Sequence, residues 1–221
     1  MLFDIDGTLL LTNRAGTQAM NRVFSRLFDL PVSPPPLDGL DIGGRSDTWI
    51  MQSIMRNHGI EHTTATANAF VRAYADELPA MLQTTGGHLL PGITPLLEAL
   101  TTEDVVLGLG TGNFRATGMA KLNHFDIGHF FSDGGFGEDS AERPEILARG
   151  ADRLRSHATP SADIVVVGDT VHDVTAGHAI GAKVVAVTTG SGTHAELAAA
   201  GADTILASCE PVPEALAAII D

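Results

Sequence analysis

Apolar and polar positions along this chain follow two different patterns. Between residues 13 and 84 the apolar positions recur every three or four residues, which predicts helices over residues 15–28, 46–58 and 63–83. From residue 85 onward, short apolar runs alternate with helical patterns, and the runs lie at residues 105–109, 164–167, 184–187 and 204–206. Apolar strands that alternate with helices are typical of a parallel sheet covered on both faces.

The first eight residues predict one more strand of this sheet. Residues 2–5 are mainly apolar and Gly7 ends the strand, so two carboxylates, Asp4 and Asp6, lie at its carboxyl end. We expect their side chains on one face, because they are two residues apart in an extended chain. Only three residues precede Asp4, whereas strands usually run about 5–6 residues. Either this strand is short or the recorded sequence begins a few residues late.

The order of the two patterns predicts the domain organisation. We expect an α/β fold with a Rossmann-like parallel-sheet core, made of residues 1–12 and 85–221. The helical segment of residues 13–84 follows the first strand, so we expect it to form an inserted helical cap domain. The core domain is then discontinuous in sequence.

Composition narrows the classes of function. The formal net charge is −14, from 27 acidic residues against 13 Lys and Arg, which argues against nonspecific binding to nucleic acid or anionic membranes. Cys209 is the single cysteine, so an intrachain disulfide is excluded. No apolar run approaches the ~18 residues of a membrane span, and no signal peptide pattern precedes the first strand. We expect a cytoplasmic protein, monomeric or homodimeric.

Three of the predicted strands are followed by polar residues. A parallel sheet binds its ligands at the carboxyl ends of its strands, so these residues should lie close together. Clustered carboxylates suit a hard cation such as Mg²⁺, and the glycine-containing pairs suit a phosphate group. The candidate site consists of Asp4, Asp6, Gly7 and Thr8; Thr111, Gly112 and Asn113; Asp169 and Asp173; and the cation Arg143.

The order of these residues resembles the four motifs of the haloacid dehalogenase superfamily. The matching segments are Asp4-Ile5-Asp6-Gly7-Thr8, Thr111, a basic residue at position 143, and Gly168-Asp169-Thr170-Val171-His172-Asp173. The resemblance covers the whole chain, including the helical cap, and is nearest to the phosphoglycolate-phosphatase-like branch. The first motif, DxDGT, is its most specific part.

The resemblance implies hydrolysis of a small phosphomonoester with Mg²⁺ as cofactor. It implies that Asp4 is the nucleophile that forms an aspartyl-phosphate, and that Asp6 is the general acid and base. The implied Mg²⁺ ligands are Asp4, the backbone carbonyl of Asp6, and Asp169, with Asp173 acting directly or through water. The implied contacts to phosphate or substrate are Gly7, Thr8, Thr111, Gly112, Asn113, Arg143 and, from the cap, Arg45.

Two positions depart from the family pattern. The third motif is usually a Lys, and here Arg143 occupies the expected place, with Lys121 as the other candidate. Arg143 is favoured because it lies between the second and fourth motifs and opens a predicted helix. Relatives that act on phosphoglycolate often carry a third acid soon after the first motif, where this chain has Leu11. The substrate therefore stays open.

Several alternatives remain at this stage. A haloacid dehalogenase needs no metal and lacks an acid at the position of Asp6, so Asp6 and Asp169 favour phosphate chemistry. A phosphomutase shares the first steps, and a catalytically weak binding or regulatory homologue keeps the fold. Structural roles also compete for single residues: Thr111 as a helix N-cap, Asp173 as a charge at a helix N-terminus, and Arg45 as a surface residue.

Overall fold

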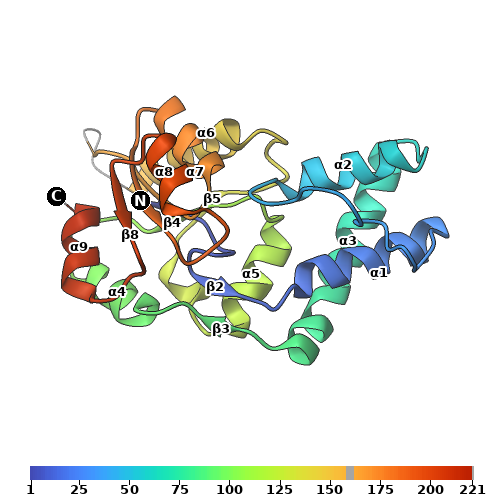
Figure 1. The fold of residues 1–221 in the computed structure, drawn as a ribbon, viewed down its shortest axis with the longest axis horizontal. Coiled ribbons are helices and arrows are strands. Elements are labelled where there is room, and N and C mark those ends of the chain that lie inside the picture. Colours follow the sequence, from blue (N-terminus) through green and yellow to red (C-terminus); the bar gives the residue numbers. More distant parts are fainter. Residues whose placement is uncertain (158–161, 221) are drawn as a thin grey trace.

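A computed structural model describes residues 1–157 and 162–220 of the chain (Figure 1). Its central feature is a six-stranded sheet in the order β5-β4-β1-β6-β7-β8, in which all neighbouring strands run parallel. The predicted α/β class is confirmed. The strands are β1 (Leu2–Phe3), β4 (Gly108–Gly110), β5 (Gly134–Gly135), β6 (Val165–Gly168), β7 (Lys183–Val187) and β8 (Thr204–Leu206).

Helices cover both faces of this sheet (Figure 1), and the two residues of β1 pack against opposite helix layers. Phe3 packs in the same apolar cluster as residues of α4, α5 and α9, whereas Leu2 packs with α6, α7 and α8. Because both side chains are almost fully buried, β1 is a central strand despite its length. The core helices are α4 (Ile93–Leu100), α5 (Arg115–His124), α6 (Arg143–Leu154), α7 (Val171–Ala179), α8 (His194–Ala199) and α9 (Val212–Ile220). Two short 3₁₀ turns lie at Gly128–Phe130 and Arg155–His157.

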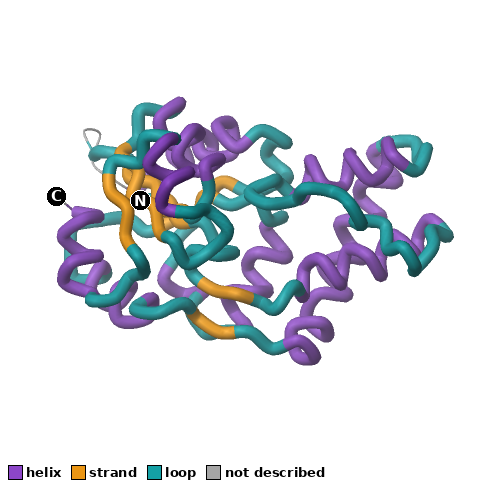
Figure 2. The backbone as a smooth tube through the Cα atoms, viewed as in Figure 1, coloured by secondary structure: helices purple, strands orange, loops and turns teal. Residues whose placement is uncertain are grey.

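Three features of the core differ from the expectation. β4 begins at Gly108 rather than at residue 105, and β5 forms at a glycine pair where no strand was predicted. β2 (Leu10–Leu11) pairs antiparallel with β3 (His88–Leu89) in a small second sheet (Figure 2). These differences share one cause: pairing with a distant strand, rather than local residue preference, decides where short strands form.

The inserted segment contains three helices, on the right in Figure 1, and their apolar cluster also includes Phe114 at the start of α5. They are α1 (Ala15–Phe28), α2 (Asp47–Asn57) and α3 (Thr64–Thr85). Phe24 of α1 stacks on Phe70 of α3 with ring centroids 4.2 Å apart. α3 continues through Pro79. We call this segment the cap; the domain boundaries after residues 12 and 84 stay a prediction.

Candidate active site

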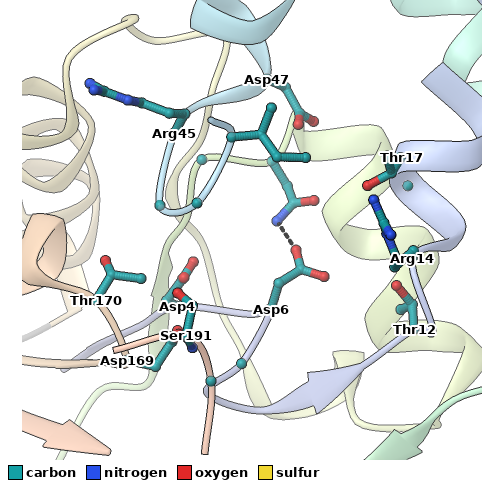
Figure 3. Close-up of a pocket in the computed structure, with 18 of the residues that line it drawn as sticks. Asp4, Asp6, Thr12, Arg14, Thr17, Arg45, Asp47, Asp169, Thr170 and Ser191 are labelled. Carbon is teal, nitrogen blue, oxygen red and sulfur yellow. Dashed lines mark hydrogen bonds between the residues drawn. The ribbon is translucent and has the colours of Figure 1, made fainter. Parts of the chain in front are cut away.

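Asp4 and Asp6 do not lie on one strand face, as the sequence suggested. β1 ends at Phe3, and the following residues form a turn in which Gly7 has φ of 84°. A Cβ atom at Gly7 would lie 2.6 Å from an Asp169 carboxylate oxygen, so the close approach favours glycine. Figure 3 shows Asp4 beside Asp169, whereas Asp6 extends in another direction. The Oδ2 atom of Asp6 accepts a hydrogen bond from Asn113. The turn thus gives the two carboxylates different surroundings.

Asp4, Asp169 and Asp173 form a buried cluster of carboxylates. One oxygen atom from each lies within 4.8 Å of the others, and each side chain is buried. Burial raises the pKa of Asp4, and it raises the pKa of Asp169 to about 8. Several acids in a small buried volume repel one another, and a bound divalent cation removes that penalty. Oxygen atoms in this arrangement fit a hard divalent cation.

Neighbouring residues orient the two acids of the fourth motif. Asp169 accepts hydrogen bonds from the Thr8 hydroxyl at 3.1 Å and from the Ser191 backbone N–H at 2.9 Å. Asp173 closes a capping box with Thr170, the N-cap residue of α7, because its Oδ2 atom accepts from the backbone N–H and the hydroxyl of Thr170. Thr8 is buried against Asp169, so its hydroxyl points toward the acid cluster.

Arg143 supplies a positive charge next to Asp4 and Asp173 of this cluster. Its Nη2 atom lies 2.9 Å from Oδ1 of Asp4 and 2.5 Å from Oδ1 of Asp173, and it also donates to the carbonyl of Gly110. The side chain is 8% exposed, and the two carboxylates raise its pKa further above the ordinary range. Its Nε atom has no hydrogen-bond partner among the described residues. Of the two candidates for the third motif, Arg143 is the one that contacts Asp4.

Lys121 lies on Asp6 instead. Its Nζ atom is 2.6 Å from Oδ2 of Asp6 and 2.6 Å from Oδ1 of Asn113. Asn113 donates from Nδ2 to the same Asp6 oxygen at 2.8 Å, and to the Thr111 hydroxyl at 2.8 Å. In the first motif, Asp4 is therefore paired with Arg143, and Asp6 is paired with Lys121.

A cavity of about 620 Å³ opens over these residues, between the core and the cap. Most of the predicted site residues line it: Asp4, Asp6, Gly7, Arg45, Gly112, Asn113, Arg143 and Asp169. The side chains of Thr8 and Thr111 are buried behind this surface. Arg45 lies over the Trp49 ring at 4.6 Å from the centroid, and Figure 3 shows its guanidinium directed away from Asp4 and Asp6.

Hydrogen bonds at the start of α2 connect the cap to the core. The backbone N–H of Asp47 donates to the carbonyl of Gly112 at 2.7 Å, and its Oδ2 atom accepts from the backbone N–H of Phe114 at 2.9 Å. Asp47 thereby caps α5, whose own N-cap residue makes no side-chain hydrogen bond. Ser46 also donates to the carbonyl of Ala141. Burial raises the pKa of Asp47 to about 7.

Three residues of this site were not assigned these roles from the sequence. Lys121 was considered for the third motif, Asp47 was part of a predicted helix, and Arg14 was given no role. Arg14 lines the cavity near Thr17, and it has no side-chain hydrogen bond or ion pair to the described residues. Asn13 and Arg14 both adopt positive φ, at 49° and 66°. No local pattern indicates such a backbone for two consecutive non-glycine residues.

The fold and the acid cluster define a hydrolase of the haloacid dehalogenase type. The family model for haloacid dehalogenase-like hydrolases matches residues 1–187, and the chain belongs to this family. Its relatives indicate that it is a phosphatase enzyme. Phosphatases of this family generally use a divalent metal, and the cluster of Asp4, Asp169 and Asp173 has the chemistry to bind one.

The chain is also similar to individual proteins of known name. The phosphoglycolate phosphatase of Mannheimia succiniciproducens is 27% identical over 200 residues, which cover 85% of this chain and 84% of that protein. The tyrosine-protein kinase PtkA of Mycobacterium tuberculosis is 30% identical over 196 residues, or 87% of this chain and 62% of PtkA. The structure of CbbY from Rhodobacter sphaeroides in complex with phosphate has a TM-score of 0.76 at 20% identity, covering 99% of this chain and 97% of CbbY. In the described part of the chain, no helix combines the length and apolarity of a membrane span.

Proposed function

We propose that this protein is a Mg²⁺-dependent phosphatase that hydrolyses a small phosphomonoester through a phosphoryl group carried on Asp4. The observation that supports this most is the position of Asp4, whose carboxylate belongs to the buried acid cluster and also lines the cavity. A dianionic phosphate approaches a carboxylate only where positive charge offsets the repulsion. Arg143, 2.9 Å from Asp4, supplies part of that charge.

Asp4, Asp169 and Asp173 would hold the Mg²⁺ ion. When bound, the ion supplies the remaining positive charge and polarises the phosphoryl group. Asp173 already accepts hydrogen bonds on both oxygen atoms, from Arg143 and Thr170. Asp173 therefore has a second role, which is to hold Arg143 against Asp4.

The reaction proceeds in two steps. An oxygen of Asp4 bonds to phosphorus while the ester P–O bond breaks, and the leaving oxygen takes a proton from Asp6. Asp6 then removes a proton from water, the water oxygen attacks phosphorus, and the bond between Asp4 and phosphorus breaks to release phosphate. Asp6 is suited to the proton transfers because its carboxylate lies apart from the acid cluster and lines the cavity.

The cap residues around the cavity suggest what the leaving group carries. In Figure 3, Arg14 and Thr17 lie on the opposite side of Asp6 from Asp4. A leaving group that extends from phosphorus past Asp6 would reach them. Arg14 has no counter-ion among the described residues, although the chain carries a net charge of −14. We therefore propose that the leaving group bears an oxyanion, either a carboxylate or a second phosphate, that pairs with Arg14.

The experiment that tests the proposed function is hydrolysis of p-nitrophenyl phosphate with Mg²⁺ and with EDTA. We expect turnover with Mg²⁺, none with EDTA, and none in Asp4→Asn. Equal rates with Mg²⁺ and EDTA would contradict the metal-dependent reaction. An active Asp4→Asn would remove Asp4 as the nucleophile.

A further inference from the structure

The side chain of Lys121 is a buried cation next to the proposed acid–base residue. It is 5% exposed, and α5 directs it toward the cap on the same helix face as Thr117, one turn earlier. Removing an ammonium group from water is costly unless it is paired and hydrogen-bonded. The charged partner of Lys121 is Asp6, at 2.6 Å.

Both polar neighbours of Asp6 use the same oxygen atom. Lys121 and Asn113 donate to Oδ2, and Oδ1 has no hydrogen-bond partner within residues 1–157 and 162–220. Lys121 also donates to Asn113, so the three side chains form a closed triangle. This triangle fixes the orientation of the carboxyl group and leaves Oδ1 as its free atom.

The cap encloses the triangle from the other side. A Cβ atom at Gly16 of α1 would lie 3.0 Å from the Tyr74 hydroxyl and 3.6 Å from Nζ of Lys121. α1 thus approaches Lys121 closely, and the glycine leaves space for the ammonium group of Lys121. Water is largely excluded from Lys121, so its hydrogen bonds to Asp6 and Asn113 are shielded from competition.

We infer that Lys121 is a positioning residue that holds the Asp6 carboxyl group so that Oδ1 exchanges protons with the leaving oxygen and with water. The inference rests on the proposed function, because it assigns a supporting role to Lys121 within that reaction. Lys121 acts through Asp6 and does not contact the phosphoryl group. Arg143 supports the nucleophile in the same way that Lys121 supports the acid.

The dependence of rate on the leaving group tests this role. A proton from Asp6 matters little when p-nitrophenolate leaves and matters much when the more basic phenolate leaves. The second-order constant kcat/KM reports phosphoryl transfer to Asp4. We therefore measure it for p-nitrophenyl phosphate and phenyl phosphate in the parent, Lys121→Met, Lys121→Arg and Asp6→Asn proteins, all with Mg²⁺.

We expect Lys121→Met to lose about 10²-fold more kcat/KM on phenyl phosphate than on p-nitrophenyl phosphate, as Asp6→Asn does. Lys121→Arg should restore most of the loss. Equal losses on both substrates, or no loss, would overturn the inference while leaving the proposed function in place. If Lys121→Met does not fold, Lys121→Gln replaces it, since the amide keeps a donor without the charge. A parent enzyme that hydrolyses neither substrate would overturn the proposed function and this inference together.

Discussion

A single guanidinium nitrogen of Arg143 lies between Oδ1 of Asp4 and Oδ1 of Asp173, at 2.9 and 2.5 Å. All three side chains are buried, and this one cation offsets the charges of both acids. Removing one partner of a buried ion pair typically costs about 3–5 kcal/mol, because the remaining charges stay unpaired. We expect Arg143→Ala to lower the free energy of unfolding by about that amount in metal-free buffer.

Urea unfolding measures this loss, and Arg149→Ala is the matched control. Arg149 belongs to the same helix, α6, and has no ion pair or side-chain hydrogen bond to the described residues. Arg143→Lys should recover part of the stability, since a lysine keeps the charge but cannot reproduce the fork of the guanidinium. If Arg143→Ala is as stable as Arg149→Ala, the ion pair is not essential to the fold.

Binding of Mg²⁺ should raise the thermal stability of the protein without any substrate. A cation that binds the native state and not the unfolded chain stabilises the native state by RT ln(1 + c/Kd), where c is the cation concentration, so the stability grows with the logarithm of that concentration. We expect the melting temperature to rise with Mg²⁺ in the parent protein and to stay constant in Asp169→Asn. Asp6→Asn should keep the rise, since its side chain lies outside the acid cluster. A rise that survives in Asp169→Asn would place the ion elsewhere.

Asp47 should make stability depend on pH. Burial raises its pKa from 3.8 to about 7, so the native state holds a proton that the unfolded chain has lost between these values. The protonated carboxyl group of Asp47 therefore contributes to the free energy of unfolding. This contribution is full below about pH 4 and is lost as pH rises to about 7. In Asp47→Asn the amide oxygen can still accept from Phe114, but it does not titrate.

Unfolding of the parent and Asp47→Asn proteins at pH 5 and pH 8 measures this effect. The parent should lose up to about 3 kcal/mol more stability than the variant across this interval, since pH 5 lies about two units below the pKa of about 7 and each unit is worth about 1.4 kcal/mol. Identical pH profiles would show that Asp47 is ionised in the native protein at pH 5. The metal should be absent, so that the acid cluster contributes equally to both proteins.

Arg14 should select substrates by the charge of the leaving group. We expect Arg14→Gln to raise KM about tenfold or more for phosphomonoesters with a carboxylate or a second phosphate, and to leave p-nitrophenyl phosphate little changed. Arg56→Gln is the control, because Arg56 is an exposed arginine of the cap outside the cavity. A panel of phosphorylated metabolites identifies the substrates and separates carboxylates from bisphosphates. An equal effect on every substrate would contradict an oxyanion contact at Arg14.

The residues adjacent to strand ends were the predictable part of the site. Asp4 and Asp169 directly follow short apolar runs, and Asp173 lies in the first turn of the helix that comes after the second of these runs. Parallel strands bring their carboxyl ends to one edge of the sheet. Lys121 and Asp47 were not predictable in the same way. Both lie on helices, and which helix face meets the other domain depends on packing between the cap and the core. The divergence of Asp4 and Asp6 depends on the early end of β1 and the turn at Gly7.

The proposed reaction depends on a phosphoryl group bound to Asp4, and rapid quenching tests this directly. The parent enzyme is mixed with Mg²⁺ and p-nitrophenyl phosphate, quenched in acid within the first turnover, digested and analysed by mass spectrometry. We predict one phosphoryl group on the peptide that contains Asp4, and none in the same peptide from Asp4→Asn. Phosphate release without any phosphorylated peptide, or with the phosphoryl group on another residue, would contradict the account.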